Sequence, residues 1–176
     1  MNWQRVLDTH SQAAKSLAEA AEQIPPEQWL TPRAEGKWSP GHVLQHLNQT
    51  YDVLLRELRG GIGMAVQTTL WQRMLLRLTV VPKILRGGWF PSGARAPREI
   101  RPAEPAADKD AAIAKFRALS KEFDSAAVKA QANGGQKLSH AYFGRSGVPD
   151  SVLLCTRHIE HHDRQLRSMT RTETAG

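Results

Sequence analysis

The chain has 176 residues, 40% of them apolar and 23% charged, which predicts one globular domain over residues 1–176 with a hydrophobic core. No segment approaches the roughly 18 uninterrupted apolar residues of a membrane-spanning helix, and no apolar run follows a basic start, so we expect neither a membrane span nor a signal peptide. The single cysteine excludes an internal disulfide and favours the reducing cytoplasm, and the formal net charge is +7.

Five segments repeat apolar residues at spacings of three and four, which predicts five helices. The second begins after Ser39, a good N-cap that is followed by Pro40 at the first helical position. Asp108 is the expected N-cap of the fourth helix. Prolines and glycines mark most of the helix ends. The expected helices cover roughly residues 2–23, 40–58, 66–85, 109–132 and 149–170.

The third predicted helix contains Pro82, which should kink it or end it early. Its apolar stripe would serve either the core or a homodimer interface, and consists of Trp71, Met74, Leu78, Val81 and Leu85. Residues 86–106 follow and are rich in proline, glycine and arginine. Loops of this length are usually functional or mobile, and Trp89 and Phe90 are expected to anchor this one. No segment has the pattern of a good strand, so we predict an all-α fold: a four-helix bundle with one additional short or kinked helix and a long loop.

Three of the seven histidines lie within five positions of the last predicted helix, in the segment RHIEHHDRQL. The core seam of this helix places His162 where a leucine would be expected; the seam is Val152, Cys155, Ile159, His162, Leu166 and Met169. His158 stacks on the same side one turn earlier, with Gln165 on its flank and His161 near the rim. Two imidazoles at this spacing can converge on one metal ion, although a polar pair satisfied by its neighbours is the alternative.

A third ligand would have to come from elsewhere in the chain, and four histidines are candidates. His10 lies on the apolar face of the first helix, where a core histidine is the ordinary explanation. His42 and His46 share a face of the second helix, but that face is off its leucine stripe, so periodicity does not bury His46. His140 lies in a connector. The residue pattern therefore leaves the third ligand open, and it supports neither a zincin-type protease nor a serine hydrolase.

Three segments resemble the DinB-like superfamily of metal-binding four-helix bundles. KWSPGHVLQHL is similar to the W-S-x-x-x-x-x-x-H-L opening of the family's second helix. LSHAYFG is similar to a His-Pro-x-Phe-Gly segment of one subfamily, and RHIEHHDRQL to the same subfamily's H-x-x-H-H-x-x-Q motif. The resemblance covers essentially the whole chain. Two departures are His42, where many relatives have Glu, and Ala141, where the subfamily segment has Pro.

The resemblance implies a divalent metal site, with zinc or nickel held by His46, His158 and His162. Three imidazoles leave coordination positions for water or substrate, as a catalytic site requires. Characterised relatives include transferases and isomerases that use low-molecular-weight thiols. The resemblance thus implies a metal-dependent thiol transferase, or a related hydrolase or isomerase, acting on a small molecule. Gln165, His42 and His161 would then support the ligands or the substrate.

The positive charge is concentrated in one region: residues 56–101 hold nine lysines and arginines against Glu57 and Glu99. Such a region can face an anionic small molecule, a nucleic acid or a membrane surface, or can simply be solvated. Arg95, Arg98 or Arg101 could hold a carboxylate of a thiol or of its acceptor. The segment has no signature of a nucleic-acid-binding module, so nucleic acid is not an expected partner, and we do not expect a membrane partner either. The alternative function is a non-catalytic metal- or ligand-binding bundle of the stress-response kind.

Overall fold

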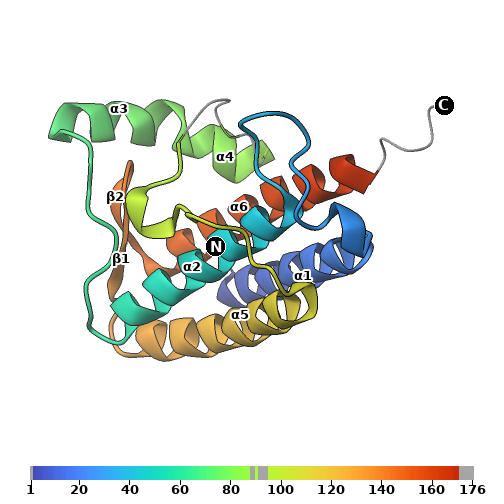
Figure 1. The fold of residues 1–176 in the computed structure, drawn as a ribbon. Helices are drawn as coiled ribbons and strands as arrows, with labels where there is room; N and C mark the ends of the chain where they lie inside the picture. The colour runs from blue at the N-terminus through green and yellow to red at the C-terminus, as the bar shows by residue number, and fades with distance from the viewer. Residues whose placement is uncertain (1, 88–89, 91–94, 171–176) are drawn as a thin grey trace.

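Four long helices form the body of the protein in a computed structural model, which describes residues 2–87, 90 and 95–170 (Figure 1). Helix α1 packs along α6 and α5, and α2 packs along α5, so the expected all-α bundle is confirmed. None of the helices in these ranges is long and apolar enough to cross a membrane. The bundle helices are α1 (Trp3–Glu22), α2 (Pro40–Leu58), α5 (Lys109–Ala132) and α6 (Val148–Thr170).

Side-chain caps explain where three of these helices begin. Asn2 accepts a hydrogen bond from the backbone N–H of Arg5 at the start of α1. Ser39 caps α2 ahead of Pro40, and Asp108 caps α5, as the sequence predicts. Each cap satisfies one of the backbone N–H groups that the first helical turn leaves without a partner.

The core lies between the four helices and follows the predicted stripes. The largest fully buried side chains include residues from all four helices and Trp29, which directly follows the short turn η1 (Pro26–Gln28); among them are Leu17, Leu44, Tyr51, Phe116, Phe123 and Ile159. In α6 the seam is buried from Val152 to Leu166. This burial sets which side of α6 faces α2, and so which of its histidines point into the bundle.

A short antiparallel hairpin corrects the expectation that the chain has no strand. Strand β1 (Lys137–His140) pairs with β2 (Gly144–Gly147), with Leu138 opposite Ser146. The buried carboxylate of Glu57 on α2 holds the hairpin, because it accepts hydrogen bonds from the Ser139 N–H at 2.8 Å and from the Ser139 hydroxyl at 2.6 Å. A tertiary contact from α2 therefore stabilises two strands whose own sequences do not predict a hairpin.

The third predicted helix is shorter than expected and is divided in two. Helix α3 (Leu70–Thr79) begins four residues late because residues 67 and 68 run beside the hairpin: the Gln67 N–H donates to the Ala141 carbonyl at 2.8 Å. Thr69 then caps α3. Helix α4 (Val81–Gly87) starts after a break ahead of Pro82, which confirms the predicted interruption.

The apolar stripe predicted for this helix does not enter the core. Trp71 and Leu78 are 77% and 71% exposed, and Met74 is also exposed. Val81 and Leu85 are half-buried, while Ile84 of α4 is fully buried. Arg157 of α6 donates to the Leu85 carbonyl at 3.1 Å, which fastens α4 to the bundle. Thus α4 is attached to the bundle, whereas the apolar face of α3 lies outside it (Figure 1).

Candidate metal centre

Three histidines from two helices meet inside the bundle. The Nε2 atom of His158 lies 3.0 Å from Nε2 of His46 and 3.0 Å from Nε2 of His162. One nitrogen from each ring falls within 4.8 Å of the others. Ligand nitrogens on a tetrahedral zinc, each at about 2.0–2.1 Å from the ion, are about 3.3 Å apart. The spacing of these three nitrogens therefore fits one ion of that size.

The far sides of two of these rings are already engaged. His46 Nδ1 lies 2.6 Å from the carbonyl oxygen of Ile100, at the end of the turn η2 (Arg98–Ile100). His162 Nδ1 lies 2.8 Å from the side-chain oxygen of Gln165. A carbonyl oxygen can only accept, so Nδ1 of His46 carries the proton, and the same holds for His162 with the amide oxygen facing it. Both Nε2 atoms then present lone pairs to the space between the rings.

Burial keeps these imidazoles neutral. It lowers the pKa of His46 from its ordinary value to about 4, against the opposing effect of the hydrogen bond to Ile100. Burial is also the main cause that holds the pKa values of His158 and His162 well below the usual range, and the neighbouring histidines add to it. Neutral imidazole is the form that binds a metal ion, so the rings are in the required state at neutral pH.

The burial of His46 corrects the inference from the helical wheel. This residue is 2% exposed although its face of α2 lies off the leucine stripe. Two segments outside the four-helix core cover that face: η2 supplies the Ile100 carbonyl, and the ring of Trp38 lies 4.9 Å from the His46 ring. The periodicity of α2 records only the contacts with its neighbouring bundle helices, so it could not report this cover.

Aromatic rings form the wall of the cluster. Trp38 stacks on His162 with ring centroids 6.4 Å apart and an interplanar angle of 21°. Phe90 lies 5.8 Å from His158 and 5.0 Å from the half-buried His161. The expected anchoring contact of Phe90 is thus present, whereas Trp89 lies outside the described residues. From the sequence, Trp38 stood out only as part of the family motif. Its position directly before Ser39, the cap of α2, is the feature that could have placed it near His46.

Two other candidate histidines, His42 and His140, are not part of the cluster. His42 lies in the first turn of α2, where its Nδ1 atom is 2.8 Å from the Ser39 hydroxyl and completes a capping box. His140 lies on β1, where its Nδ1 accepts from the N–H groups of Tyr142 and Phe143 at 3.2 and 3.3 Å. Burial lowers the pKa of His140 to about 4, and its proximity contributes to the lowered pKa of His158.

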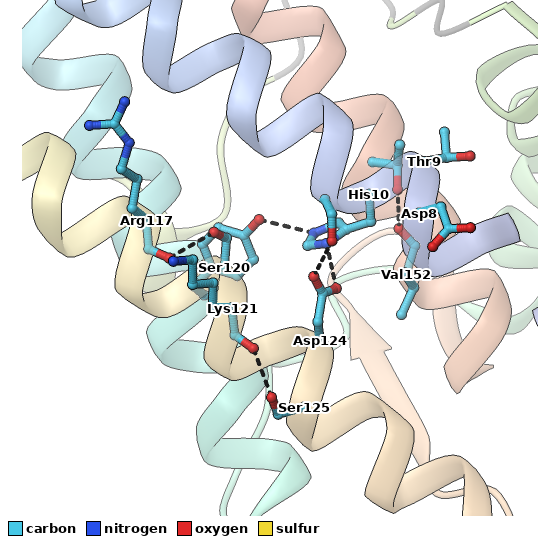
Figure 2. A network of polar contacts seen from close by, with 12 residues as sticks. Asp8, Thr9, His10, Arg117, Ser120, Lys121, Asp124, Ser125 and Val152 are labelled. Carbon is cyan, nitrogen blue, oxygen red and sulfur yellow. Dashed lines mark hydrogen bonds and ion pairs between the residues drawn. The ribbon is translucent and has the colours of Figure 1, made fainter. Parts of the chain in front are cut away.

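His10 shows how a core histidine is satisfied without a metal (Figure 2). It is fully buried, its Nδ1 atom lies 2.7 Å from a carboxylate oxygen of Asp124, and its Nε2 atom lies 3.0 Å from the Tyr51 hydroxyl. Each nitrogen of this ring therefore has a protein partner: the carboxylate beside Nδ1 and the hydroxyl beside Nε2. Cys155 lies beside this network, and burial raises the pKa of its thiol to about 12. A thiol in that state does not act as a nucleophile at neutral pH.

The arginines proposed from the sequence lie in the loop that supplies Ile100. Arg98 is exposed in η2, two residues before Ile100, whose carbonyl contacts His46. Arg101 is exposed and folds back on its own loop, with its Nε atom donating to the Ala96 carbonyl at 3.0 Å. Arg95 is exposed, and its carbonyl accepts from the Tyr142 hydroxyl at 2.6 Å. The structure thus places the three arginines in the same segment as the His46 partner, without contact to the cluster.

Comparison with known proteins gives one finding. A family model described as the DinB superfamily matches residues 9–166, which include all three clustered histidines and the loop before α5. Neither the curated proteins nor the solved structures contain a match.

Proposed function

Because this chain belongs to the DinB superfamily, we propose that it is a metal-dependent enzyme whose divalent ion, zinc or nickel, is held by His46, His158 and His162. One observation carries the proposal: three neutral imidazoles turn their Nε2 atoms toward one point. Superfamily membership and the match of spacing to zinc support it.

The cluster cannot satisfy its own hydrogen bonds. The Nδ1 atoms of His46 and His162 hold their protons against Ile100 and Gln165, so both Nε2 atoms are acceptors. His158 can offer at most one Nε2 proton, which serves one of these acceptors well and leaves the other unpaired. A buried acceptor without a partner costs about 1–3 kcal/mol. A cation at the meeting point would satisfy all three, which distinguishes this cluster from His10.

The chain's own residues would prepare this site for chemistry on a small molecule. An ion held by three imidazoles keeps open coordination positions and lowers the pKa of a thiol or water bound there. Gln165 and the Ile100 carbonyl orient the imidazoles that they contact, as hydrogen-bond partners of metal ligands do. The rings of Trp38 and Phe90 lie against the imidazoles of His46 and His158 and would limit the access of water to them. The expected reactions are transfer of a low-molecular-weight thiol, or a related hydrolysis or isomerisation.

The basic loop would supply the contact for an anionic group of the substrate. Arg98 and Arg101 are exposed in the segment that holds Ile100, whose carbonyl contacts His46, so two cationic side chains belong to the loop that covers the cluster. A planar guanidinium binds carboxylate with paired hydrogen bonds. We therefore expect a substrate or thiol cosubstrate that carries a carboxylate.

A specific observation keeps a non-catalytic, metal- or ligand-binding role as the second candidate. The partners found for the clustered histidines are a backbone carbonyl, an amide and aromatic rings, none of which takes up a proton at neutral pH. His161, half-buried beside Phe90, would then be the candidate general base. Replacing His161 by Asn should abolish turnover and leave metal content unchanged in an enzyme, whereas a binding module shows no turnover in either form.

The decisive experiment uses protein purified without an affinity tag. Elemental analysis should give one zinc or nickel per chain, and His158→Ala should lose it, while His10→Asn keeps it. A screen of thiol adducts and of hydrolysable esters then tests for turnover. Wild-type protein without stoichiometric divalent metal, combined with a His158→Ala variant of unchanged metal content and thermal stability, would contradict the proposal.

A further inference from the structure

Helix α3 turns its apolar face away from the protein. Five large apolar side chains of this ten-residue helix are exposed, three of them by more than two thirds: Leu70 at 77%, Trp71 at 77%, Met74 at 48%, Leu75 at 62% and Leu78 at 71%. At 100° per residue they occupy one continuous side of the helix. We call these five side chains the α3 face. Contiguous exposed apolar patches on a folded protein usually mark a binding surface.

The inward side of α3 is fixed by polar contacts. Arg73 donates to the Thr68 carbonyl at 3.1 Å, and its side chain lies against Gly144 of the hairpin, in the space that a Cβ atom there would need. Leu76 and Val80, on the same side as Arg73, are half-buried. Because Arg73 is held inward, the α3 face must point outward. Figure 1 shows α3 at the edge of the molecule, outside the four-helix body.

The chain segment that contains the α3 face is basic, and its two acidic side chains are already hydrogen-bonded. Residues 56–101 hold nine lysines and arginines and two glutamates. Glu57 is buried against Ser139, and Glu99 accepts from the Ala65 N–H at 2.9 Å. Arg77 is exposed at the border of the face, on the side of Leu70 and about two turns further along the helix, and Lys83 and Arg86 are exposed on α4.

We propose that the α3 face binds the surface of an anionic lipid bilayer. A short helix with tryptophan and leucine on one side and basic residues at its border lies in the interface of a bilayer, where acyl chains receive the apolar side chains and the headgroups receive the cations. An anionic bilayer therefore complements both features of this region. A second copy of the chain would complement the apolar side chains but not the cations, because it would bring another basic segment whose own acidic side chains are buried or hydrogen-bonded.

The proposal concerns attachment at the surface of a bilayer, for which no spanning helix is needed. It also gives the regional charge a role that is independent of the histidine cluster. Leu75 and Leu78 can be replaced without touching the core, because their side chains are 62% and 71% exposed. Trp71 offers a spectroscopic reporter at the centre of the face.

Co-sedimentation with vesicles tests the proposal on the full chain. Wild-type protein should pellet with an equimolar mixture of phosphatidylglycerol and phosphatidylcholine, and much less with phosphatidylcholine alone. The double variant Leu75→Ser/Leu78→Ser should partition at least about tenfold more weakly, and Arg77→Gln should weaken binding at low ionic strength. Leu30→Ser/Val128→Ser is the matched control, because it removes exposed apolar side chains outside α3 and should bind like wild type.

Two further readouts make the result decisive. Emission of Trp71 should shift to shorter wavelength with anionic vesicles, and this shift should be missing in Trp71→Phe. Circular dichroism should show the same helix content in all variants. Equal pelleting of wild type and Leu75→Ser/Leu78→Ser, or no pelleting at low ionic strength, would overturn the proposal. So would a dimer in solution that this double variant converts to a monomer, since the face would then bind a second copy.

Discussion

Replacing Gln165 tests whether the cluster is a metal site whose ligands are held by hydrogen bonds. The amide oxygen of Gln165 receives the Nδ1 proton of His162 at 2.8 Å, which leaves Nε2 of that ring free to coordinate. Gln165→Met has nearly the same length but cannot accept this proton. Gln165→Glu accepts it more strongly, because an ionised acceptor makes a stronger hydrogen bond.

The magnitude follows from what such partners contribute in metal sites. Loss of a hydrogen-bond partner of a ligating histidine typically weakens metal affinity by about 10- to 100-fold, or about 1.4–2.7 kcal/mol. His162 is one of three ligands in the proposed site, so we expect Gln165→Met to fall in this range and Gln165→Glu to bind at least as tightly as wild type. Gln4→Met, which removes an exposed amide bonded to Asp8, should change nothing.

Competition with a chromophoric chelator measures the zinc affinity of metal-free protein refilled with a known amount of zinc. Circular dichroism and urea unfolding show whether each variant is folded. If Gln165→Met is folded and binds zinc as tightly as wild type, the amide does not orient a ligand, and His162 is not one of the residues that hold the ion. Weaker binding in Gln165→Glu than in Gln165→Met would refute the reasoning from the tautomer.

Three further predictions concern the stability of the protein, the first of them in its metal-free form. Burial lowers the pKa of His46 to about 4 in the folded state, below the roughly 6.5 of an unfolded chain, so the unfolded state binds more protons between these two pH values. The free energy of unfolding should therefore fall as pH drops through that window, by up to about 1.4 kcal/mol per pH unit from this group. Unfolding in urea at several pH values should show a weaker dependence of this free energy on pH in His46→Asn than in wild type. Glu57→Gln should cost about 1.5–3 kcal/mol, because the amide cannot accept from both the N–H and the hydroxyl of Ser139, whereas exposed Glu27→Gln should be neutral; equal stability of the two variants would contradict this. Tyr51→Phe removes the hydroxyl that faces the buried core histidine and should cost about 1–3 kcal/mol with metal content unchanged; loss of metal would show that the two networks are coupled.

The helices that pack on one another were predictable from the sequence, because burial along a straight interface repeats with the period of the helix. The caps at Ser39 and Asp108 were predictable for a similar reason, since their hydrogen bonds are local. The seam of α6 shows how far this extends: a histidine in a leucine position identified His162 as an inward-facing residue. These features depend on neighbours in the sequence or on one packed face.

The hairpin and the orientation of α3 were not predictable in this way. Each strand has only four residues, two of those in β2 are glycines, and the contact that stabilises the pair comes from Glu57, about eighty residues earlier in the chain. In α3 the apolar stripe shows that one face is apolar, but not where this face points. That direction is set by Arg73, whose contacts with Thr68 and Gly144 hold the opposite side inward.

The long loop before α5 explains why the third histidine could not be chosen from the pattern of α2, and it ties the cluster to the basic residues. Ile100, 54 residues away from His46 in sequence, accepts the Nδ1 proton of that ring. Any ion held by the Nε2 atom of His46 strengthens this hydrogen bond and so stabilises the loop conformation in which it forms, and by linkage a substrate that fixes the loop favours the ion. Arg98 lies two residues before Ile100 in the chain, and Arg101 directly follows it. In the proposed site, binding of an anionic group by the loop and binding of metal by the bundle are therefore coupled through one peptide group, which makes the loop part of the site rather than a connection between helices.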